Sequence, residues 1–506
     1  MRERITFVQR LGDALDPSVL QIAGGVISGP EIAAAREDRL TFATDEFPDE
    51  LWLLLRGIHQ LHIRWASADA YEAVSPFLSR LPPGFHAFLT PESKSYTESP
   101  KLCAILADIF GKLDCSTPAE SFTSLPHDRF SHSTSLQYYH PLDDLSHFIR
   151  YAKEKLCPPA DASCVTRVDS LAKASSLDIS YDEISHALKV TATWPYQRQP
   201  VQVTSRPPFR TEVGILSADK PQTLEPHELG ISGLLTVLGQ DPEPKPTLFS
   251  FASRHRDAES AFSVKWMEPT GLHPTLQIRL DSNTLPKEAD GAFCSPHAYL
   301  TLPRGVFADK YQLSDGLFLA SKNLTALRYT SQPVDLEAPE YAMKRWGSAI
   351  LVELTPPKET EGKEAWTAEI PLHLRYLSPA EGGYAGLKVP YPVVFWACAA
   401  EEGTKFPNNP FERANLGYDG LFGPRTVFWH VEPRPEGNSL MTTLNVPVLD
   451  LAKSQHVNVG TAIAVLLGFA WAAWKLFGVF ATSGYGREEG SKAKTGKKPS
   501  EDKKKQ

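Results

Sequence analysis

The chain has 506 residues, of which 42% are hydrophobic and 22% charged, and it contains 42 prolines and six cysteines. This composition is typical of a globular protein, and the length suggests two or three domains. The many prolines argue against a mainly helical protein. The formal net charge of -8 argues against a general nucleic-acid binder, because phosphate neutralisation needs concentrated Lys and Arg.

Most of residues 1–440 has the pattern of β-strands. Apolar and polar residues alternate between turn-forming residues in five segments, at 61–65, 187–194, 275–280, 349–354 and 370–376. The proline-rich segment 240–247 is the best linker candidate. We therefore predict a mainly β fold with two β-rich units, residues 1–240 and residues 248–440. At the start of the first unit, MRERITFVQR is followed by no apolar core or cleavage site, so no cleavable signal peptide is predicted.

One helix is predicted after Pro141, where an apolar stripe runs to Leu156 and Pro158-Pro159 end it. Four polar residues on the same segment form the most enzyme-like group in the chain: His140, Asp143, Asp144 and His147. Their spacing could gather imidazoles and a carboxylate around a metal ion. Because the apolar stripe already explains the helix, we expect these side chains to be its solvated face. No nucleotide-binding glycine motif or nucleophile elbow occurs, so we predict neither catalytic residues nor a cofactor or metal.

The six cysteines show no closely spaced pair of the kind that binds zinc. In an oxidising compartment they could form disulfides, and in the cytosol they would be buried thiols. The only glycosylation sequon is Asn323-Leu324-Thr325, and one such match is close to chance in a chain of this length.

A membrane-spanning helix is predicted at residues 457–481. These 25 residues contain one charge, Lys475, and at 1.5 Å per residue they can cross a hydrocarbon layer of about 30 Å. Small residues recur every fourth position on one helix face, at Gly460, Ala464, Gly468 and Ala472. Such a stripe allows another helix to approach closely, so we predict a helix-packing face.

The tail after the span, residues 482–506, is predicted to be disordered and basic, with eight basic and four acidic residues. Positive flanks stay in the cytosol, so the large N-terminal part should face the lumen. The final residues include Lys503 and Lys504, which resemble a KKXX signal for retrieval to the endoplasmic reticulum. The missing signal peptide favours the alternative of a tail-anchored protein with a cytosolic domain.

Three C-terminal stretches resemble the PIG-X family: CSPHAYLTLPRGVFADKYQL at 294–313, IPLHLRYLSPAEGGYAGLKVPYPVVFWAC at 370–398 and LGYDGLFGPRTVFWHV at 416–431. The resemblance covers about 270–440, and the extension before it resembles the fungal branch, known as the protease B non-derepressible family. It implies a β-sandwich-like interaction domain whose motif residues are scaffold. Cys294 opens the first block and Cys398 closes the second, so a bridge between them is the preferred pairing.

The resemblance also implies a function. Members of the PIG-X family are the non-catalytic subunit of glycosylphosphatidylinositol (GPI) mannosyltransferase I in the endoplasmic reticulum. Their polytopic partner, the PIG-M-type subunit, carries the active site and adds the first mannose from dolichyl-phosphate mannose. Fungal members also support the folding of other proteins of this compartment. The expected role is therefore a chaperone-like stabilising subunit, and the alternatives are the tail-anchored cytosolic adaptor and a luminal metal-dependent hydrolase that uses His140 and His147.

Overall fold

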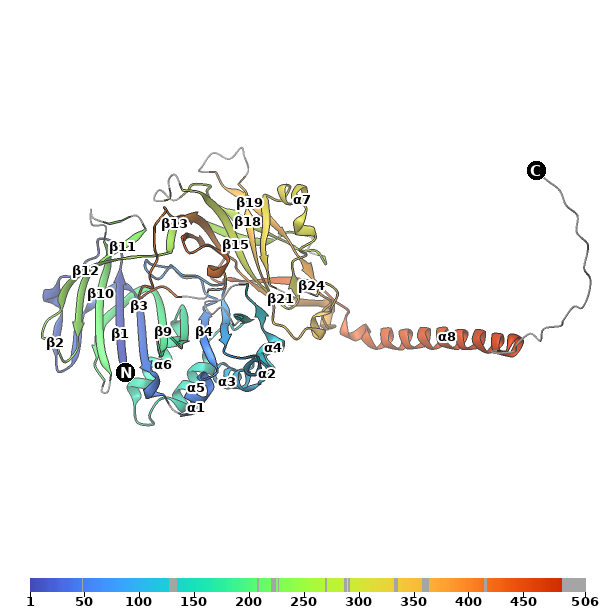
Figure 1. The fold of residues 1–506 in the computed structure, drawn as a ribbon, viewed down its shortest axis with the longest axis horizontal. Helices are drawn as coiled ribbons and strands as arrows, with labels where there is room; N and C mark the ends of the chain where they lie inside the picture. The colour runs from blue at the N-terminus through green and yellow to red at the C-terminus, as the bar shows by residue number, and fades with distance from the viewer. Residues whose placement is uncertain are drawn as a thin grey trace, which may run out of the picture. The chain divides into compact units, whose positions relative to one another are not determined.

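A computed structural model describes residues 1–484 except residues 48, 127–133, 207–208, 220–223, 226, 269–270, 286–288, 290–291, 332–334, 357–363 and 414–415. The described chain forms two compact units. The first holds Met1–Ser378 and Ala385–Val448, and the second holds Pro379–Tyr384 and the chain from Leu449 onward. The first unit contains both large sheets, and the second contains the long C-terminal helix (Figure 1).

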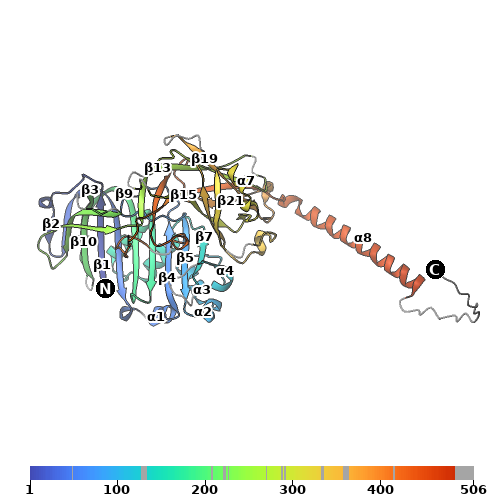
Figure 2. The same ribbon diagram turned by 45° about the horizontal axis from the view of Figure 1, so that its top comes forward.

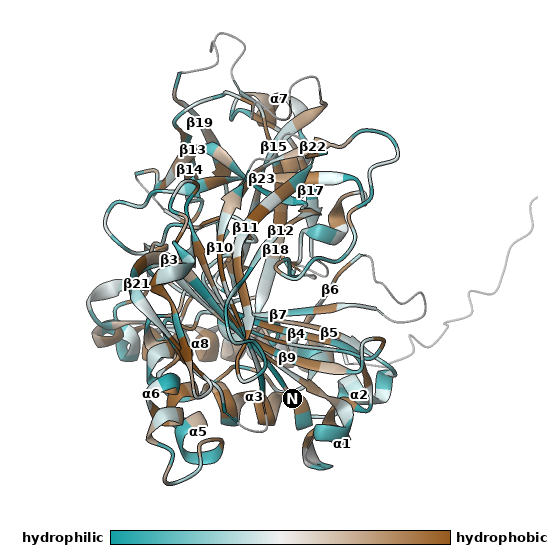
Figure 3. Ribbon diagram, turned by 90° about the vertical axis from the view of Figure 1, so that its left-hand side faces the viewer, coloured by the Kyte–Doolittle hydropathy of each residue, from teal (hydrophilic) through white to brown (hydrophobic). Residues whose placement is uncertain are grey.

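The N-terminal sheet has twelve strands in the order β12-β11-β10-β1-β3-β9-β8-β4-β5-β7-β6, with β2 paired to β3. Its strands are β1 (Arg2–Gln9), β2 (Gln21–Ala23), β3 (Val26–Ala43), β4 (Ile58–Ala66), β5 (Gly84–Pro91), β6 (Thr123–Ser124), β7 (Leu136–His140), β8 (Ser176–Asp182), β9 (Ala187–Thr204), β10 (Arg210–Asp219), β11 (Glu228–Val237) and β12 (Lys245–Ala252). Hydrophilic segments interrupt hydrophobic ones along these strands (Figure 3).

Six helices accompany this sheet: α1 (Asp49–Leu55), α2 (Lys94–Glu98), α3 (Lys101–Phe110), α4 (Pro118–Ser121), α5 (Ser146–Lys155) and α6 (Ala162–Ser170). Of these, α1 to α4 gather along one side of the strands in two views (Figures 1 and 2). The predicted helix after Pro141 begins only at Ser146, because His140 ends strand β7 and residues 141–145 form the connection.

The C-terminal sheet has eight strands in the order β17-β18-β15-β22-β23-β13-β14-β19. They are β13 (His255–Trp266), β14 (Thr275–Leu280), β15 (Cys294–Pro303), β17 (Leu324–Thr330), β18 (Gly347–Leu354), β19 (Trp366–Pro371), β22 (Val393–Ala399) and β23 (Thr426–Pro433). The sheet curls so that its two edges meet: the Glu369 N–H of edge strand β19 donates to the Lys322 carbonyl beside edge strand β17 (3.0 Å). One continuous sheet thus forms the part for which the family resemblance implies a β-sandwich-like domain.

Two short sheets complete the fold. One pairs β16 (Val306–Phe307) with β20 (His373–Leu374), and the other pairs β21 (Tyr384–Pro390) with β24 (Met441–Pro447). The remaining helices are α7 (Gly316–Ala320) and α8 (Leu451–Ser483). The mainly β fold class with one apolar C-terminal helix is therefore confirmed.

The two large sheets share one hydrophobic core. Phe85 and Tyr138 of the N-terminal sheet belong to the same buried cluster as Phe395 and Phe428 of the C-terminal sheet. The Gln137 side-chain amide also donates to the Tyr299 hydroxyl across the two sheets (3.0 Å). The chain passes from the N-terminal sheet to the C-terminal sheet after Ala252. The linker candidate, residues 240–247, instead contains part of the turn between β11 and β12 and the start of β12. Separate folding of residues 1–240 and 248–440 remains a prediction.

Candidate partner-binding surface

Two of the segments that resemble family blocks pair with each other. Val306 lies opposite Leu374, and Phe307 lies opposite His373, in the β16–β20 ladder. The Arg375 N–H extends this ladder by donating to the Gly305 carbonyl (2.9 Å). Segments more than 60 residues apart in sequence therefore form one local structure, which neither could form alone.

Arg375 ties a third segment to this pair. Its side chain is buried, with the residue only 4% exposed, and its guanidinium lies 4.5 Å above the Phe307 ring. Its Nη1 donates to the Ala338 carbonyl (2.8 Å), and the Tyr376 carbonyl accepts from the Glu340 N–H (3.0 Å). Burial lowers the pKa of Arg375 from its ordinary value. These two hydrogen bonds hold the segment around 338–340 against residues 375–376.

The contacts of the His373 ring are those of a packed structural residue. Its Nε2 lies 3.0 Å from the Gln312 side-chain oxygen, and its ring contacts the rings of His273 and Phe307. Burial lowers the pKa of His373, which favours the neutral imidazole. No carboxylate or nucleophilic side chain is hydrogen-bonded to this ring among the described residues. The arrangement fits a packed scaffold.

Three tyrosines on these segments point into solvent: Tyr311, Tyr341 and Tyr376, which are 67%, 68% and 69% exposed. We call them the tyrosine surface. Large exposed aromatic side chains are enriched where proteins bind one another, because they supply apolar area together with a hydroxyl that stays hydrated. Nothing in the sequence pattern singled them out, since their exposure depends on how the three segments come together. The tyrosine surface is the best candidate for a partner contact in this unit.

Helix α8 contains the whole predicted span, residues 457–481. Its 33 residues extend about 50 Å, which exceeds the roughly 30 Å hydrocarbon layer. The Asp450 side chain caps the helix by accepting from the Ala452 N–H (3.1 Å). The backbone of Ala380 makes two hydrogen bonds at the start of the helix. Its N–H donates to the Leu449 carbonyl, and its carbonyl accepts from the Leu451 N–H. This apolar helix is compatible with a single-pass membrane protein.

No other part of the described chain packs against Gly460 or Gly468 on the predicted packing face of α8. A Cβ atom added at Gly460 or Gly468 would meet no atom within 4 Å. Together with Ala464 and Ala472, these residues remain a predicted helix-packing face. The tail from 485 onward, with the predicted retrieval residues Lys503 and Lys504, lies outside the described residues.

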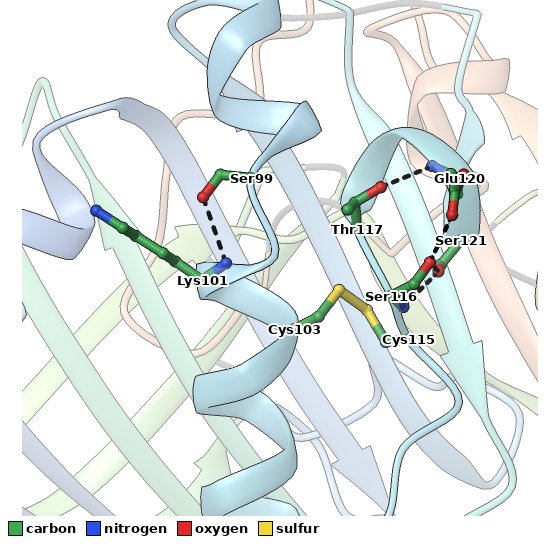
Figure 4. Close-up of a disulfide and its surroundings, with 8 residues drawn as sticks. All are labelled: Ser99, Lys101, Cys103, Cys115, Ser116, Thr117, Glu120 and Ser121. Carbon is green, nitrogen blue, oxygen red and sulfur yellow. Dashed lines mark hydrogen bonds between the residues drawn. A yellow bond between two sulfur atoms is a disulfide. The ribbon is translucent and has the colours of Figure 1, made fainter.

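All six cysteines form disulfides. Cys294 bonds Cys398, the predicted pair, and the two residues lie directly opposite each other in strands β15 and β22. The other bridges are Cys103–Cys115 and Cys157–Cys164. The Cys103–Cys115 bridge ties α3 to the loop before α4, where Thr117 caps the helix by accepting from the Glu120 N–H (Figure 4).

Asn323 has a clear structural role. It adopts a left-handed backbone (φ 55°), which asparagine tolerates better than most residues. Its side-chain amide donates to the Thr367 carbonyl of edge strand β19 (2.8 Å), next to the place where the C-terminal sheet curls together. A glycan on this nitrogen would leave one N–H for that bond. Glycosylation of Asn323 remains a prediction.

The proposed metal-binding face is not assembled. His140 ends strand β7, whereas His147 lies in α5 with its Nδ1 3.3 Å from the Ile109 carbonyl. Asp143 forms an ion pair with Lys388, and Asp144 accepts from the Ser146 N–H at the start of α5 (2.7 Å). Among the described residues, no three metal-ligating side chains are grouped to hold an ion. The hydrolase alternative therefore loses its geometric basis.

Comparison with known proteins identifies close relatives. The family model described as PIG-X / PBN1 matches residues 269–477. Protein pbn1 of Neurospora crassa is 66% identical over 96% of this chain and 97% of its own length. Protein PBN1 of Gibberella zeae is 48% identical, and protein pbn1 of Emericella nidulans is 45% identical, each over the same shares of the two chains. These names give no enzymatic activity.

Proposed function

Because this chain belongs to the PIG-X / PBN1 family, we propose that it is the non-catalytic stabilising subunit of GPI mannosyltransferase I in the endoplasmic reticulum. Family identity supports a role in GPI-anchor biosynthesis. The proposed partner is the polytopic PIG-M-type subunit, which adds the first mannose to the GPI precursor. By the same family resemblance, the chain also gives chaperone-like support to other proteins of this compartment.

The observation that carries this proposal is the pairing of the two family segments, together with the exposed tyrosines that these segments and the adjoining segment around 338–340 carry. A subunit that stabilises another protein needs a rigid, exposed contact area more than it needs reactive groups. The β16–β20 pair and the buried Arg375 supply the rigidity, and Tyr311, Tyr341 and Tyr376 supply the exposed area. Helix α8 adds a second contact within the membrane, through Gly460, Ala464, Gly468 and Ala472.

Cells depleted of this chain should lose most of the polytopic subunit and of first-mannose transfer, because the partner would lack its stabilising contacts. Re-expression of the wild-type chain restores both, whereas Tyr376→Ala and Gly468→Leu restore less and co-purify several-fold less partner. Leu248→Ala is the control, since Leu248 is 61% exposed but lies on strand β12 of the N-terminal sheet. Partner abundance and mannose transfer that stay normal after depletion would refute the proposed function.

The proposed orientation places the large unit in the lumen and the basic tail in the cytosol. We expect the wild-type chain and Thr325→Ser to shift in mobility after endoglycosidase treatment, because both keep the sequon at Asn323. Asn323→Gln and Thr325→Ala should show no shift. Asn323→Gln should also lower stability, by about 1 kcal/mol, because it removes the part-buried hydrogen bond to Thr367, whereas Thr325→Ala removes only the exposed hydrogen bond to the Thr355 hydroxyl and should cost less. Digestion of the large unit by protease outside sealed vesicles would contradict this orientation and favour the cytosolic adaptor.

A further inference from the structure

One face of the N-terminal sheet concentrates cationic side chains. Arg4 of β1 lies opposite Arg39 of β3, and Arg39 lies opposite Thr191 of β9. Alternate residues of a strand share a face, so Glu37 lies on the same face as Arg39. Arg413, from the segment between β22 and β23, joins them by forming an ion pair with Glu37.

Glu37 is the acidic centre of this group and is fully buried. Its carboxylate accepts from Arg4 Nη2 (2.6 Å) and from Arg413, and Arg39 Nη2 lies 3.5 Å from it. Burial alone would raise the pKa of Glu37, but Arg413, Arg39 and Arg4 together lower it to about 2. One carboxylate is therefore shared by three guanidinium groups.

The shared Glu37 carboxylate does not fully neutralise the positive charge of Arg39. Burial, with the positive charge of Arg413, lowers the pKa of Arg39 to about 9. The Nε atoms of Arg39 and Arg4 are buried without a hydrogen-bond partner within the described chain. Burial and the charge of Arg39 also lower the pKa of Lys189 on β9. Such desolvated cations are costly unless an anion accompanies them.

The charges on this face do not balance among the described residues. The cationic side chains of this cluster are Arg4, Arg39, Arg64, Arg413 and Lys189, and the acidic ones on the same face of strands β3 and β8 are Glu37, Asp178 and Asp182. Beside the cluster, Glu212 of β10 lies opposite Arg4 but forms an ion pair with Arg210. The other face of the same strands does balance, since Arg36 and Arg167 pair with Glu3 and Asp38. The excess of about two positive charges is thus confined to the face that carries Arg4, Arg39 and Lys189.

We propose that Arg4, Arg39 and Lys189 form a binding site for a phosphoryl group, either free phosphate or the phosphate of a lipid headgroup. Guanidinium groups match tetrahedral oxyanions in charge and geometry, and a phosphate dianion would cancel the excess. The site is open to such a ligand, because the side chains of Arg4 and Arg39 are 23% and 14% exposed and Lys189 is half-buried. This site is independent of the proposed subunit function.

The test measures thermal unfolding of the full-length chain in neutral detergent, with sodium phosphate against sodium chloride at equal ionic strength. Saturating phosphate should raise the Tm of the wild-type chain by about 5 °C. Arg39→Gln should abolish this rise. Its Tm without phosphate should equal or exceed that of the wild type, because the substitution removes a desolvated cation that makes no hydrogen bond through Nε.

The matched control is Arg36→Gln on the same strand, which faces the other side and pairs with Asp38. This variant should be less stable but should keep the phosphate-dependent rise. A wild-type chain that responds equally to phosphate and chloride would overturn the proposal, and so would an unchanged phosphate response in Arg39→Gln.

The source of the phosphoryl group is decided by a second comparison. Detergent micelles containing phosphatidic acid should compete with inorganic phosphate if a lipid headgroup is the ligand, whereas micelles containing phosphatidylcholine should not. Protection by inorganic phosphate with no effect of phosphatidic acid would assign the site to free phosphate. Loss of every anion effect in Arg39→Gln is required in both cases.

Discussion

Substitution of Glu37 by glutamine should lower the free energy of unfolding by about 3–5 kcal/mol, because it leaves Arg4, Arg39 and Arg413 without their shared buried counter-charge. Chemical denaturation of the full-length chain in detergent measures this loss. Glu31→Gln is the control on the same strand, since Glu31 is exposed and should change stability by less than about 0.5 kcal/mol.

The same substitution should change the acid dependence of stability. The pKa of Glu37 is about 2 in the folded protein and near its ordinary value of 4.5 when unfolded. The carboxylate therefore stabilises the fold above about pH 4.5, and this contribution disappears as the pH falls toward 2. Glu37→Gln should lose less stability than the wild-type chain over this range. Equal acid sensitivity of the two proteins would contradict the assigned role.

Removal of the Cys294–Cys398 bridge should have the second large effect. The bridge closes a loop of 104 residues, so the double variant Cys294→Ala/Cys398→Ala should lose about 4–5 kcal/mol through the greater freedom of its unfolded chain. The bridge links strand β15, through Cys294, to strand β22, through Cys398, and both cysteines pack against the core of the C-terminal sheet. Equilibrium denaturation under non-reducing conditions measures the loss.

The Cys157–Cys164 bridge provides the matched comparison. Its loop has only 7 residues, so Cys157→Ala/Cys164→Ala should lose about 2 kcal/mol by the same reasoning. The entropic explanation requires that both variants lose stability and that the Cys294→Ala/Cys398→Ala variant lose about twice as much as the Cys157→Ala/Cys164→Ala variant. Equal losses would show that local packing at the cysteines, and not loop length, determines the contribution of the bridges.

Local patterns predicted many elements of the fold. Residues 275–280 form β14 with the predicted bounds, and residues 61–65 and 187–194 lie within β4 and β9. These predictions succeed because alternating polarity suits a strand with one buried face. The helix predicted after Pro141 begins four residues later, at Ser146, since residues 136–140 pair with β5 as strand β7 and residues 141–145 form the connection. That pairing depends on residues far away in sequence.

The candidate surface and the charged cluster could not be predicted in the same way. Tyr311, Tyr341 and Tyr376 have no common spacing, and the three segments that carry them are joined only by Arg375 and the β16–β20 pair. Arg413 is 376 residues from Glu37. The consecutive charges at 36–39 within an otherwise apolar region were the one available signal of a buried network.

By itself, the sequence determined the mainly β class, the apolar C-terminal helix and the family, because each depends on residues that are neighbours along the chain. The tertiary structure alone decided which cysteines are paired outside the family blocks, which tyrosines are exposed and which cations must share one carboxylate. The exposed tyrosines and the charged cluster depend on desolvation and on contacts between distant segments, whereas the two remaining disulfides join cysteines only 12 and 7 residues apart.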